Sequence, residues 1–422
     1  MLKHQAPRGT HDFTPPASLA FRQAASLAYE VFGLYGFLPI ETPIFESTEL
    51  FTRSLGEETD IVSKEMYTFQ DRKGRSLTLR PEGTAPVVRA YLERGLAEQG
   101  LGRFCYFGPM FRYERPQAGR TRQFHQFGVE AFGEAGPAVD AEVIESFVRY
   151  CRELGLQGLE VRLNSVGCPA CRKLYVQALK ESLSGFEDKL CEQCRVRLGR
   201  NPMRILDCKN ATCKERYRGL PILMSHLCAP CAAHFEGVKA NLELLAVPYR
   251  LDPQLVRGLD YYTRTAFEVT SQHLGAQDAV GGGGRYDLLV EQFGGKPTPA
   301  FGFAAGVERL LMVREKTAAA APPPYAGSVY LAMLGERAAR RGLALAGELR
   351  SQGISCVLDG SDEGLGKKLK TASRLGFGHA VILGDTELDA GKAVVKDMQA
   401  GRQETVELGS VARHLKPPPA GV

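Results

Sequence analysis

The chain has 422 residues, 44% of them hydrophobic and 24% charged, and these ordinary values exclude a disordered or fibrous protein. Its 53 basic and 48 acidic residues give a formal net charge of +5, which permits a polyanionic partner without identifying one. The sequence contains no run of 18 or more apolar residues and no apolar leader segment, so we expect a cytoplasmic protein without a membrane partner.

The first part of the chain is predicted to be one helix followed by strands. Apolar residues recur at helical spacing from about Ser18 to Tyr35, and Gly36 ends this predicted helix. From Phe37 onward, short apolar runs alternate with proline, glycine and charged residues, a pattern typical of strands in a largely antiparallel sheet. We expect this sheet domain to occupy residues 1–167 and 246–316.

Helix-forming residues and cysteine pairs interrupt the sheet between residues 168 and 245, which predicts a helical insertion domain. Zinc knuckles hold their metal with pairs of cysteines separated by two residues, and three of the pairs have that spacing. In a reducing compartment the pattern favours one or two structural Zn2+ sites over disulfides, with reduced core thiols as the alternative. The spacing does not determine which pairs share a metal. The candidate ligands are Cys168, Cys171, Cys191, Cys194, Cys208, Cys213, Cys228 and Cys231.

A segment rich in alanine and proline, residues 317–327, lacks helical periodicity and is predicted to be a linker. Strands alternate with helices across residues 328–422, which predicts an α/β domain with a mainly parallel sheet. Lys367, Lys368, Lys370 and Arg374 make one of its helices basic. Such a helix suits phosphate contacts, although a solvated helix face is the usual explanation of a charge run.

The segment from Gly108 to Glu130 is the most informative for chemistry. Strand-like runs flank a loop that contains proline and glycine, so the sequence predicts an antiparallel hairpin with a long tip. Guanidinium groups are planar and permanently charged, and they match phosphate oxygens well. The alternative is a solvated basic hairpin. The hairpin contains Arg112, Arg115, Arg120 and Arg122.

Three segments resemble class II aminoacyl-tRNA synthetases. Residues 40–46 are similar to motif 1, whose proline lies at the dimer interface in that family, residues 111–124 to motif 2, and residues 302–310 to motif 3. The resemblance implies an α+β catalytic domain built on a mostly antiparallel sheet, a homodimer, and the ligation of an amino acid to tRNA with ATP and Mg2+.

The same resemblance implies roles for the motif residues. Arg112 would bind the α-phosphate of a bent ATP together with the carboxylate of the amino acid, and Arg309 would meet the γ-phosphate end. Arg120 is also assigned to ATP, and Phe124 offers a face for adenine. Without the family, Arg309 would be a surface helix arginine beside Glu308.

Two further segments resemble the signatures of histidyl-tRNA synthetases. These histidine segments, residues 256–265 and 281–287, imply histidine as the amino acid and tRNA(His) as its acceptor. The resemblance assigns Arg257 a catalytic role at the α-phosphate and places Glu130, Tyr262 and Tyr286 around the imidazole. A buried carboxylate and a phenol can pair both nitrogens of an imidazole, so the assignment is chemically sensible. Taken alone, the tyrosines would be half-buried strand residues and the four glycines a flexible turn.

Glu82 and Thr84 lie in another segment that resembles the family. On an extended chain, residues two apart point to the same side, so both can face the α-ammonium group of histidine. In the family a glutamine that matches Gln126 joins them. The alternative is a helix cap ahead of Ala85.

The carboxy-terminal domain resembles the anticodon-binding domain of class IIa synthetases, and Arg115 and Gln117 are predicted to touch the acceptor end of tRNA. One alternative is a non-catalytic regulatory paralogue of ATP phosphoribosyltransferase, which tends to lack that domain and part of the arginine set. A zinc-dependent nucleic-acid-binding protein is a second, but it leaves Arg112, Arg257 and Arg309 unexplained. Another class IIa synthetase is the third, and only the histidine segments disfavour it.

Overall fold

The computed structural model describes residues 4–56, 59, 61–117, 119–200, 202–208, 210–217, 219–256, 259, 261–275, 278–317 and 323–415. Among these, residues 4–12 and 20–317 belong to a larger compact unit, and residues 13–19 and 323–415 to a smaller one. Part of the predicted linker, residues 318–322, lies outside the described residues. No helix in the described ranges is long and apolar enough to cross a membrane.

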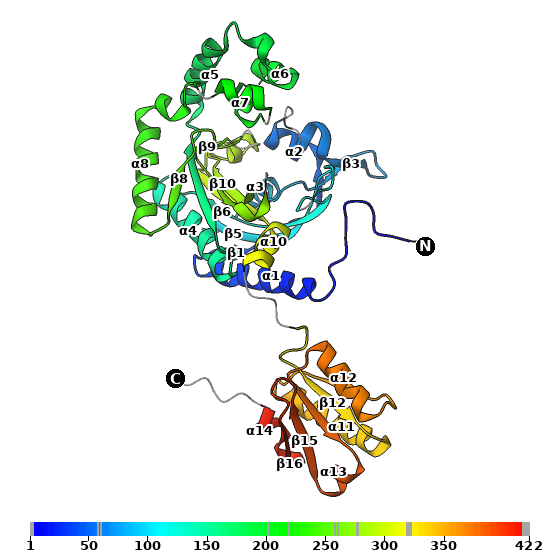
Figure 1. Ribbon diagram of the computed structural model, residues 1–422. Coiled ribbons are helices and arrows are strands. Elements are labelled where there is room, and N and C mark those ends of the chain that lie inside the picture. The colour runs from blue at the N-terminus through cyan, green and yellow to red at the C-terminus, as the bar shows by residue number, and fades with distance from the viewer. Residues whose placement is uncertain are drawn as a thin grey trace. The chain divides into compact units, whose positions relative to one another are not determined.

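An eight-stranded sheet forms the centre of the larger unit (Figure 1). Its strand order is β1-β5-β6-β11-β10-β9-β7-β8, and only the outer pairs β1/β5 and β7/β8 are parallel. The prediction of a mostly antiparallel sheet is therefore confirmed. The strands are β1 (Leu38–Pro39), β5 (Arg103–Phe111), β6 (Gln123–Phe132), β7 (Leu159–Ser165), β8 (Tyr249–Leu251), β9 (Thr263–Ser271), β10 (Ala279–Arg285) and β11 (Ala300–Gly306).

Four helices pack on one face of this sheet through a single apolar core. They are α1 (Ala17–Gly33), α4 (Pro137–Glu153), α8 (Ala229–Leu244) and α10 (Val307–Thr317). The predicted first helix is confirmed as α1. On β6, Phe127 and Val129 face this core, so the alternation of a strand turns Glu130 to the opposite face.

The opposite face holds the predicted hairpin and a second apolar cluster. Strands β5 and β6 pair along their whole length, from Arg103 opposite Ala131 to Phe111 opposite Gln123, which confirms the hairpin. A three-stranded sheet and three helices complete this side. These elements are β2 (Phe45–Ser47), β3 (Tyr67–Gln70), β4 (Ser76–Leu79), α2 (Thr48–Leu55), α3 (Thr84–Glu93) and α9 (Leu289–Gln292).

Helices fill the chain between β7 and β8. Figure 1 shows α5, α6 and α7 gathered beyond the sheet, with α8 running back alongside it. Tyr175, Leu179 and Ile205 belong to an apolar core of this segment's own. Besides α8, the helices are α5 (Pro169–Leu183), α6 (Glu192–Arg200) and α7 (Ala211–Tyr217).

The smaller unit is a five-stranded sheet in the order β13-β12-β14-β15-β16. Strands β13, β12 and β14 are parallel, as predicted, but β15 and β16 are antiparallel. The expectation of a mainly parallel sheet was therefore wrong for the last two strands. The connection from Leu383 to Lys392 is too short for a parallel crossover, and a turn ending at Gly401, with φ of +70°, joins the last two strands directly. The elements are β12 (Val329–Met333), α11 (Glu336–Ser351), β13 (Cys356–Asp359), α12 (Leu365–Leu375), β14 (His379–Leu383), α13 (Asp385–Asp389), β15 (Lys392–Asp397), β16 (Gln403–Glu407) and α14 (Val411–Leu415).

The basic helix α12 is less uniform than its sequence suggested. Lys368 is buried and donates its ammonium protons to the carbonyl oxygens of Asp359 and Ser361, at 3.2 and 2.7 Å. It holds the loop after β13 and is not available to phosphate. Lys370 and Arg374 are exposed.

Candidate active site

A buried carboxylate lies at the centre of the site. Glu130 on β6 has no exposed surface, and its Oε1 accepts a hydrogen bond of 2.7 Å from the Thr84 hydroxyl. The Tyr286 hydroxyl donates a short hydrogen bond to Oε2. The structure thus brings together three predicted residues that come from β6, the start of α3 and the end of β10.

Glycines make room for this carboxylate. A Cβ atom on Gly302, which pairs with Glu130 across the sheet, would lie 1.9 Å from Glu130 Oε2. A Cβ on Gly283 would lie 2.0 Å from the Gly302 carbonyl oxygen, and one on Gly284 would lie 2.3 Å from the Thr265 carbonyl oxygen. Side chains at these positions are therefore excluded by the close approach of neighbouring strands. The approach of a substrate to this run stays a prediction.

Glu82 lies two residues before α3, and its charge acts on Glu130. Its carboxylate accepts hydrogen bonds of 2.7 and 2.9 Å from the backbone N–H groups of Thr84 and Ala85, so the interpretation of Glu82 as a helix cap is confirmed. The prediction that Glu82 and Thr84 lie on an extended chain was wrong, because Thr84 is the first residue of a helix. Burial raises the pKa of Glu82 above its ordinary value.

Tyrosine rings pack together beside Glu130. Tyr262 is buried, with its ring centroid 4.8 Å from that of Tyr261, which in turn lies 5.7 Å from Tyr286. Sequence reasoning missed Tyr106, which is buried on β5 and belongs to the same apolar cluster. The only signal for it was its place on the inward-facing side of a strand.

Two polar atoms of the site find no hydrogen-bond partner among the described residues. They are the hydroxyl oxygen of Tyr106 and Oε1 of Gln126. Buried polar atoms without a partner are uncommon, and a bound polar substrate would satisfy them. Gln126 was predicted to bind the substrate, whereas Tyr106 is a new candidate.

The protonation of Glu130 should make stability depend on pH. Burial raises the pKa of Glu130 from its ordinary 4.5 to about 8, so the folded state keeps a proton that the unfolded state loses within this window. The contribution of Glu130 to the free energy of unfolding is therefore greatest below pH 4.5. It falls by a few kcal/mol as the pH rises from 4.5 to about 8. Urea unfolding from pH 5 to 9 should show a steeper decline in the wild type than in Glu130→Gln. Equal slopes would contradict the proton assignment.

Arg112 follows β5 and is fixed in two ways. Its Nε donates a hydrogen bond of 2.9 Å to the Pro81 carbonyl oxygen, and its guanidinium carbon lies 5.2 Å from the ring centre of Phe124. Burial lowers the pKa of Arg112, and the charges of Glu114 and Glu82 oppose that shift. The guanidinium is therefore a cation held near the carboxylate pocket.

The hairpin tip brings a second and a third arginine into the same cluster. Arg120 pairs with Glu114 at 2.9 Å, and a Cβ on Gly119 would lie 3.5 Å from a guanidinium nitrogen of Arg309. Arg309, in the first turn of α10, donates its Nε proton to the Ala279 carbonyl oxygen at 2.7 Å. The charge of Arg120 lowers the pKa of both Arg112 and Arg309, although burial has the larger effect.

Not every predicted residue can be placed. Arg257, predicted to be catalytic, lies outside the described residues. Arg115 and Gln117 are exposed at the hairpin tip. Arg122 lies over the Tyr113 ring, 4.1 Å from its centre, so it supports the hairpin.

The eight cysteines of residues 168–245 form two groups. Cys168, Cys171, Cys228 and Cys231 make the first cysteine cluster, and Cys191, Cys194, Cys208 and Cys213 make the second. Within each cluster the four sulfurs lie within 4.8 Å of one another. The structure therefore shows which cysteine pairs lie together in one cluster, which the sequence left open.

Sulfur separations in both clusters fit a tetrahedral metal. Four sulfurs at about 2.3 Å from Zn2+ are about 3.8 Å apart. Cys168 Sγ lies 3.6 Å from Cys171 Sγ and 3.9 Å from Cys228 Sγ. In the second cluster, the backbone N–H of Cys194 lowers the pKa of the Cys191 thiol to about 7. Donors of this kind stabilise thiolates, so the residues present fit a metal ion.

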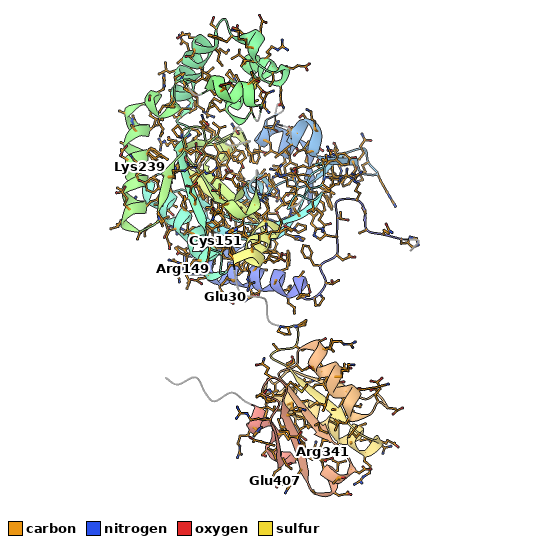
Figure 2. The ribbon with its side chains drawn as sticks, viewed as in Figure 1. Glu30, Arg149, Cys151, Lys239, Arg341 and Glu407 are labelled. Atoms are coloured by element: carbon orange, nitrogen blue, oxygen red, sulfur yellow. The ribbon has the colours of Figure 1, made fainter. Side chains whose placement is uncertain are left out.

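The remaining cysteines are buried elsewhere. Cys105, Cys151 and Cys356 lie in apolar cores, and Cys151, labelled in Figure 2, has no exposed surface. Burial raises the pKa of the Cys105 thiol to about 11. These three behave as core thiols.

The segment that resembles motif 1 is held by buried hydrogen bonds and also carries an exposed apolar surface. Arg80 donates hydrogen bonds of 2.9 Å to the carbonyl oxygens of Thr42 and Pro109, which joins this segment to the hairpin. Next to it lies a group of exposed apolar side chains, and the rings of Phe45 and Phe69 are 6.4 Å apart. The group, called here the apolar patch, consists of Ile44, Phe45 and Phe69.

Two family profiles match the chain. The profile described as Histidyl-tRNA synthetase matches residues 9–180 and 215–310, and the profile described as Anticodon binding domain matches residues 328–416. Among curated proteins, the chain is 49% identical to a histidine–tRNA ligase of Halothermothrix orenii, over 98% of this chain and 99% of the relative. It is 48% identical to that of Natranaerobius thermophilus, over 98% of each chain.

Solved structures agree with these matches. The apo histidyl-tRNA synthetase of S. aureus has a TM-score of 0.81 and 37% identity, covering 98% of this chain and 99% of that one. A structure described as an ATP phosphoribosyltransferase regulatory subunit/histidyl-tRNA synthetase from Bacillus halodurans has a TM-score of 0.67, and covers 91% of this chain and 99% of that chain. At 22% identity, the second likeness concerns the fold alone.

Proposed function

The chain belongs to the histidyl-tRNA synthetase family, and from this premise we propose which residues carry its reaction. The enzyme activates L-histidine with ATP to histidyl-adenylate and transfers it to tRNA(His), releasing diphosphate and AMP. The regulatory alternative is not favoured, because histidine–tRNA ligases match nearly the whole chain. We place the reaction in the cytoplasm.

The observation that carries the assignment of the pocket is the buried Glu130, whose carboxyl oxygens accept hydrogen bonds from the hydroxyls of Thr84 and Tyr286. In our proposal the imidazole of histidine lies between Glu130, Tyr262 and Tyr286. A polar, buried pocket of this kind rejects apolar side chains, because they would leave its polar groups unpaired. Glu82, Thr84 and Gln126 would bind the α-ammonium group.

The arginine cluster would act on ATP. The histidine carboxylate attacks the α-phosphate and diphosphate leaves, so negative charge gathers on the phosphates. Arg112 and Arg257 would bind the α-phosphate, with Arg120 and Arg309 toward the leaving diphosphate. Phe124 would stack on adenine with the face that Arg112 does not cover.

Mg2+ enters with ATP and neutralises phosphate charge when bound. It prefers carboxylate oxygens, and the Glu114 carboxylate, 2.9 Å from Arg120, lies within the cluster, while the charge of Glu268 acts on Arg309. We propose them as the side chains able to hold it.

Transfer to tRNA is the second step. The terminal ribose hydroxyl attacks the carbonyl carbon of the adenylate and AMP leaves. We propose that the exposed Arg115 and Gln117 contact the acceptor end, and that the smaller unit binds the anticodon.

Exchange of labelled pyrophosphate into ATP tests the amino acid, with each of the twenty amino acids in turn. Histidine should support exchange far better than any other. Equal exchange with proline or threonine would overturn the assignment of the pocket.

We propose that the apolar patch is part of a homodimer interface. Phe45 is 52% exposed, and replacing it by glutamate would place a charge within that interface. Phe45→Glu should sediment with the mass of one 46.1 kDa chain, and the wild type with twice that mass. Leu244→Glu is the matched control, because Leu244 on α8 is 84% exposed outside the patch. A dimeric Phe45→Glu would contradict this interface.

We also propose that each cysteine cluster holds one structural Zn2+. The sulfur separations and the N–H donors to sulfur support this, and four-cysteine sites are a common structural zinc site. No step of the reaction needs this metal.

A further inference from the structure

The first cysteine cluster lies where the helical segment leaves and rejoins the sheet. Cys168 immediately precedes α5 and Cys228 immediately precedes α8. The backbone N–H of Cys228 donates to Cys171 Sγ at 3.1 Å. One cluster therefore ties the starts of two helices that are 60 residues apart in the sequence.

On the α5 side the cluster touches the first histidine segment. Gly167, next to Cys168, accepts a hydrogen bond of 2.9 Å from the backbone N–H of Arg264, and Val166 donates one of 2.6 Å to the Arg264 carbonyl oxygen. A Cβ on Gly167 would lie 2.6 Å from Cys171 Cβ, so the cysteine packs directly on this backbone. Arg264 has φ of +51°, an uncommon conformation that its neighbours must hold, and it lies two residues after Tyr262.

On the α8 side a chain of buried polar groups reaches the second histidine segment. His234 lies three residues after Cys231, and its Nε2 is 2.9 Å from Asp140 Oδ2. Asp140 forms a buried ion pair with Arg285, which immediately precedes Tyr286. All three side chains are buried, so the geometry of each depends on the next.

The second cysteine cluster differs in its surroundings. Within the described part of the chain, the hydrogen bonds of its sulfur atoms run to its own cysteines, to Asn210 and to Tyr217. Its buried cysteines belong to the core of the helical segment. Its sulfurs therefore have no described hydrogen bond to either histidine segment, and the contact of this core with the cluster that holds Tyr262 and Tyr286 runs through the side chain of Met203.

We infer that Zn2+ in the first cluster is a positioning element for the histidine pocket. The four thiolates fix the starts of α5 and α8, and these hold the segments that carry Tyr262 and Tyr286. Zn2+ in the second cluster stabilises the core of the helical segment, which has no described hydrogen-bonded route to either histidine segment. The inference rests on the proposed assignment of both tyrosines to the pocket.

Two matched double variants test it. Cys168→Ser with Cys228→Ser removes one ligand from each pair of the first cluster, and Cys191→Ser with Cys208→Ser does the same in the second. Metal analysis of the purified full chain should find two zinc ions per wild-type chain and one in each variant. The first variant should raise the KM for histidine in pyrophosphate exchange at least about tenfold and leave the KM for ATP near wild type. The second should change neither constant.

A third variant tests the α8 side without removing a ligand. His234→Ala should keep both zinc ions and raise the KM for histidine, and His234→Gln, which can still donate to Asp140, should restore it. If the first double variant fails to fold by circular dichroism, this pair decides the question.

The inference is overturned if the second double variant raises the KM for histidine as much as the first, or if His234→Ala leaves that constant unchanged. It also fails if wild-type chains hold no zinc. Absence of histidine-dependent exchange in a zinc-loaded wild type would instead refute the proposed pocket, so the two failures can be told apart.

Discussion

Arg112→Ala is expected to lower histidine-dependent pyrophosphate exchange by at least about a thousandfold. The guanidinium is held by the Pro81 carbonyl oxygen and the Phe124 ring, so it is already oriented before the phosphate arrives. A pre-oriented cation stabilises the charge that develops at the α-phosphate without reorganisation. Steady-state exchange should show the loss mainly in kcat, because the interaction strengthens in the transition state.

Arg53→Ala provides the control. Arg53 pairs with Glu49 at the surface of α2, and its side chain is 63% exposed. The loss of the Arg53 side chain should leave exchange near wild type, since surface ion pairs contribute little.

Arg257→Ala should lower histidine-dependent exchange by orders of magnitude while the fold persists. Near-normal exchange in Arg112→Ala would remove the basis of the proposed mechanism.

Glu130→Gln is expected to lower kcat/KM for histidine by about a hundredfold or more. Binding of the imidazole would favour the ionised form of Glu130, to which the hydroxyls of Thr84 and Tyr286 can both donate, whereas a glutamine NH2 group would face a donor. The pocket would then lose an acceptor that it cannot replace. The KM for ATP should change little, because the arginine cluster stays intact.

Glu134→Gln is the matched control for this change. Glu134 pairs with Arg103 at the surface, with a side chain that is 47% exposed. The same chemical substitution there should leave the histidine constants unchanged. If both variants bind histidine equally well, Glu130 does not contact the imidazole.

Several features of the chain follow from local spacing. The hairpin from Gly108 to Glu130 and helix α1 were predictable because strands and helices repeat over a few residues. The order of the motif-like segments indicated the family, and the matched profiles confirm it. The cysteine spacing indicated a metal site for the same reason, because ligand pairs are close in the chain.

Other features depended on residues far apart in sequence. Glu130 meets Thr84 across 46 positions and Tyr286 across 156, and Cys168 meets Cys228 across 60. No local pattern encodes such pairs, since they form only when strands and helices pack. For the same reason the sequence missed Tyr106.

The sequence by itself therefore determined the family, the antiparallel sheet and the types of residue available for chemistry. Tertiary structure decided which of them are buried together, and burial decides their chemical state. Lys368 belongs to a helix that suited phosphate contacts, but it is buried and bonded to backbone carbonyl oxygens. Glu130 was predicted to be a buried carboxylate, and only the folded chain shows the burial that raises its pKa to about 8. The physical reason is that hydration and hydrogen-bond partners set the protonation and availability of a side chain, and both are fixed only by the folded chain.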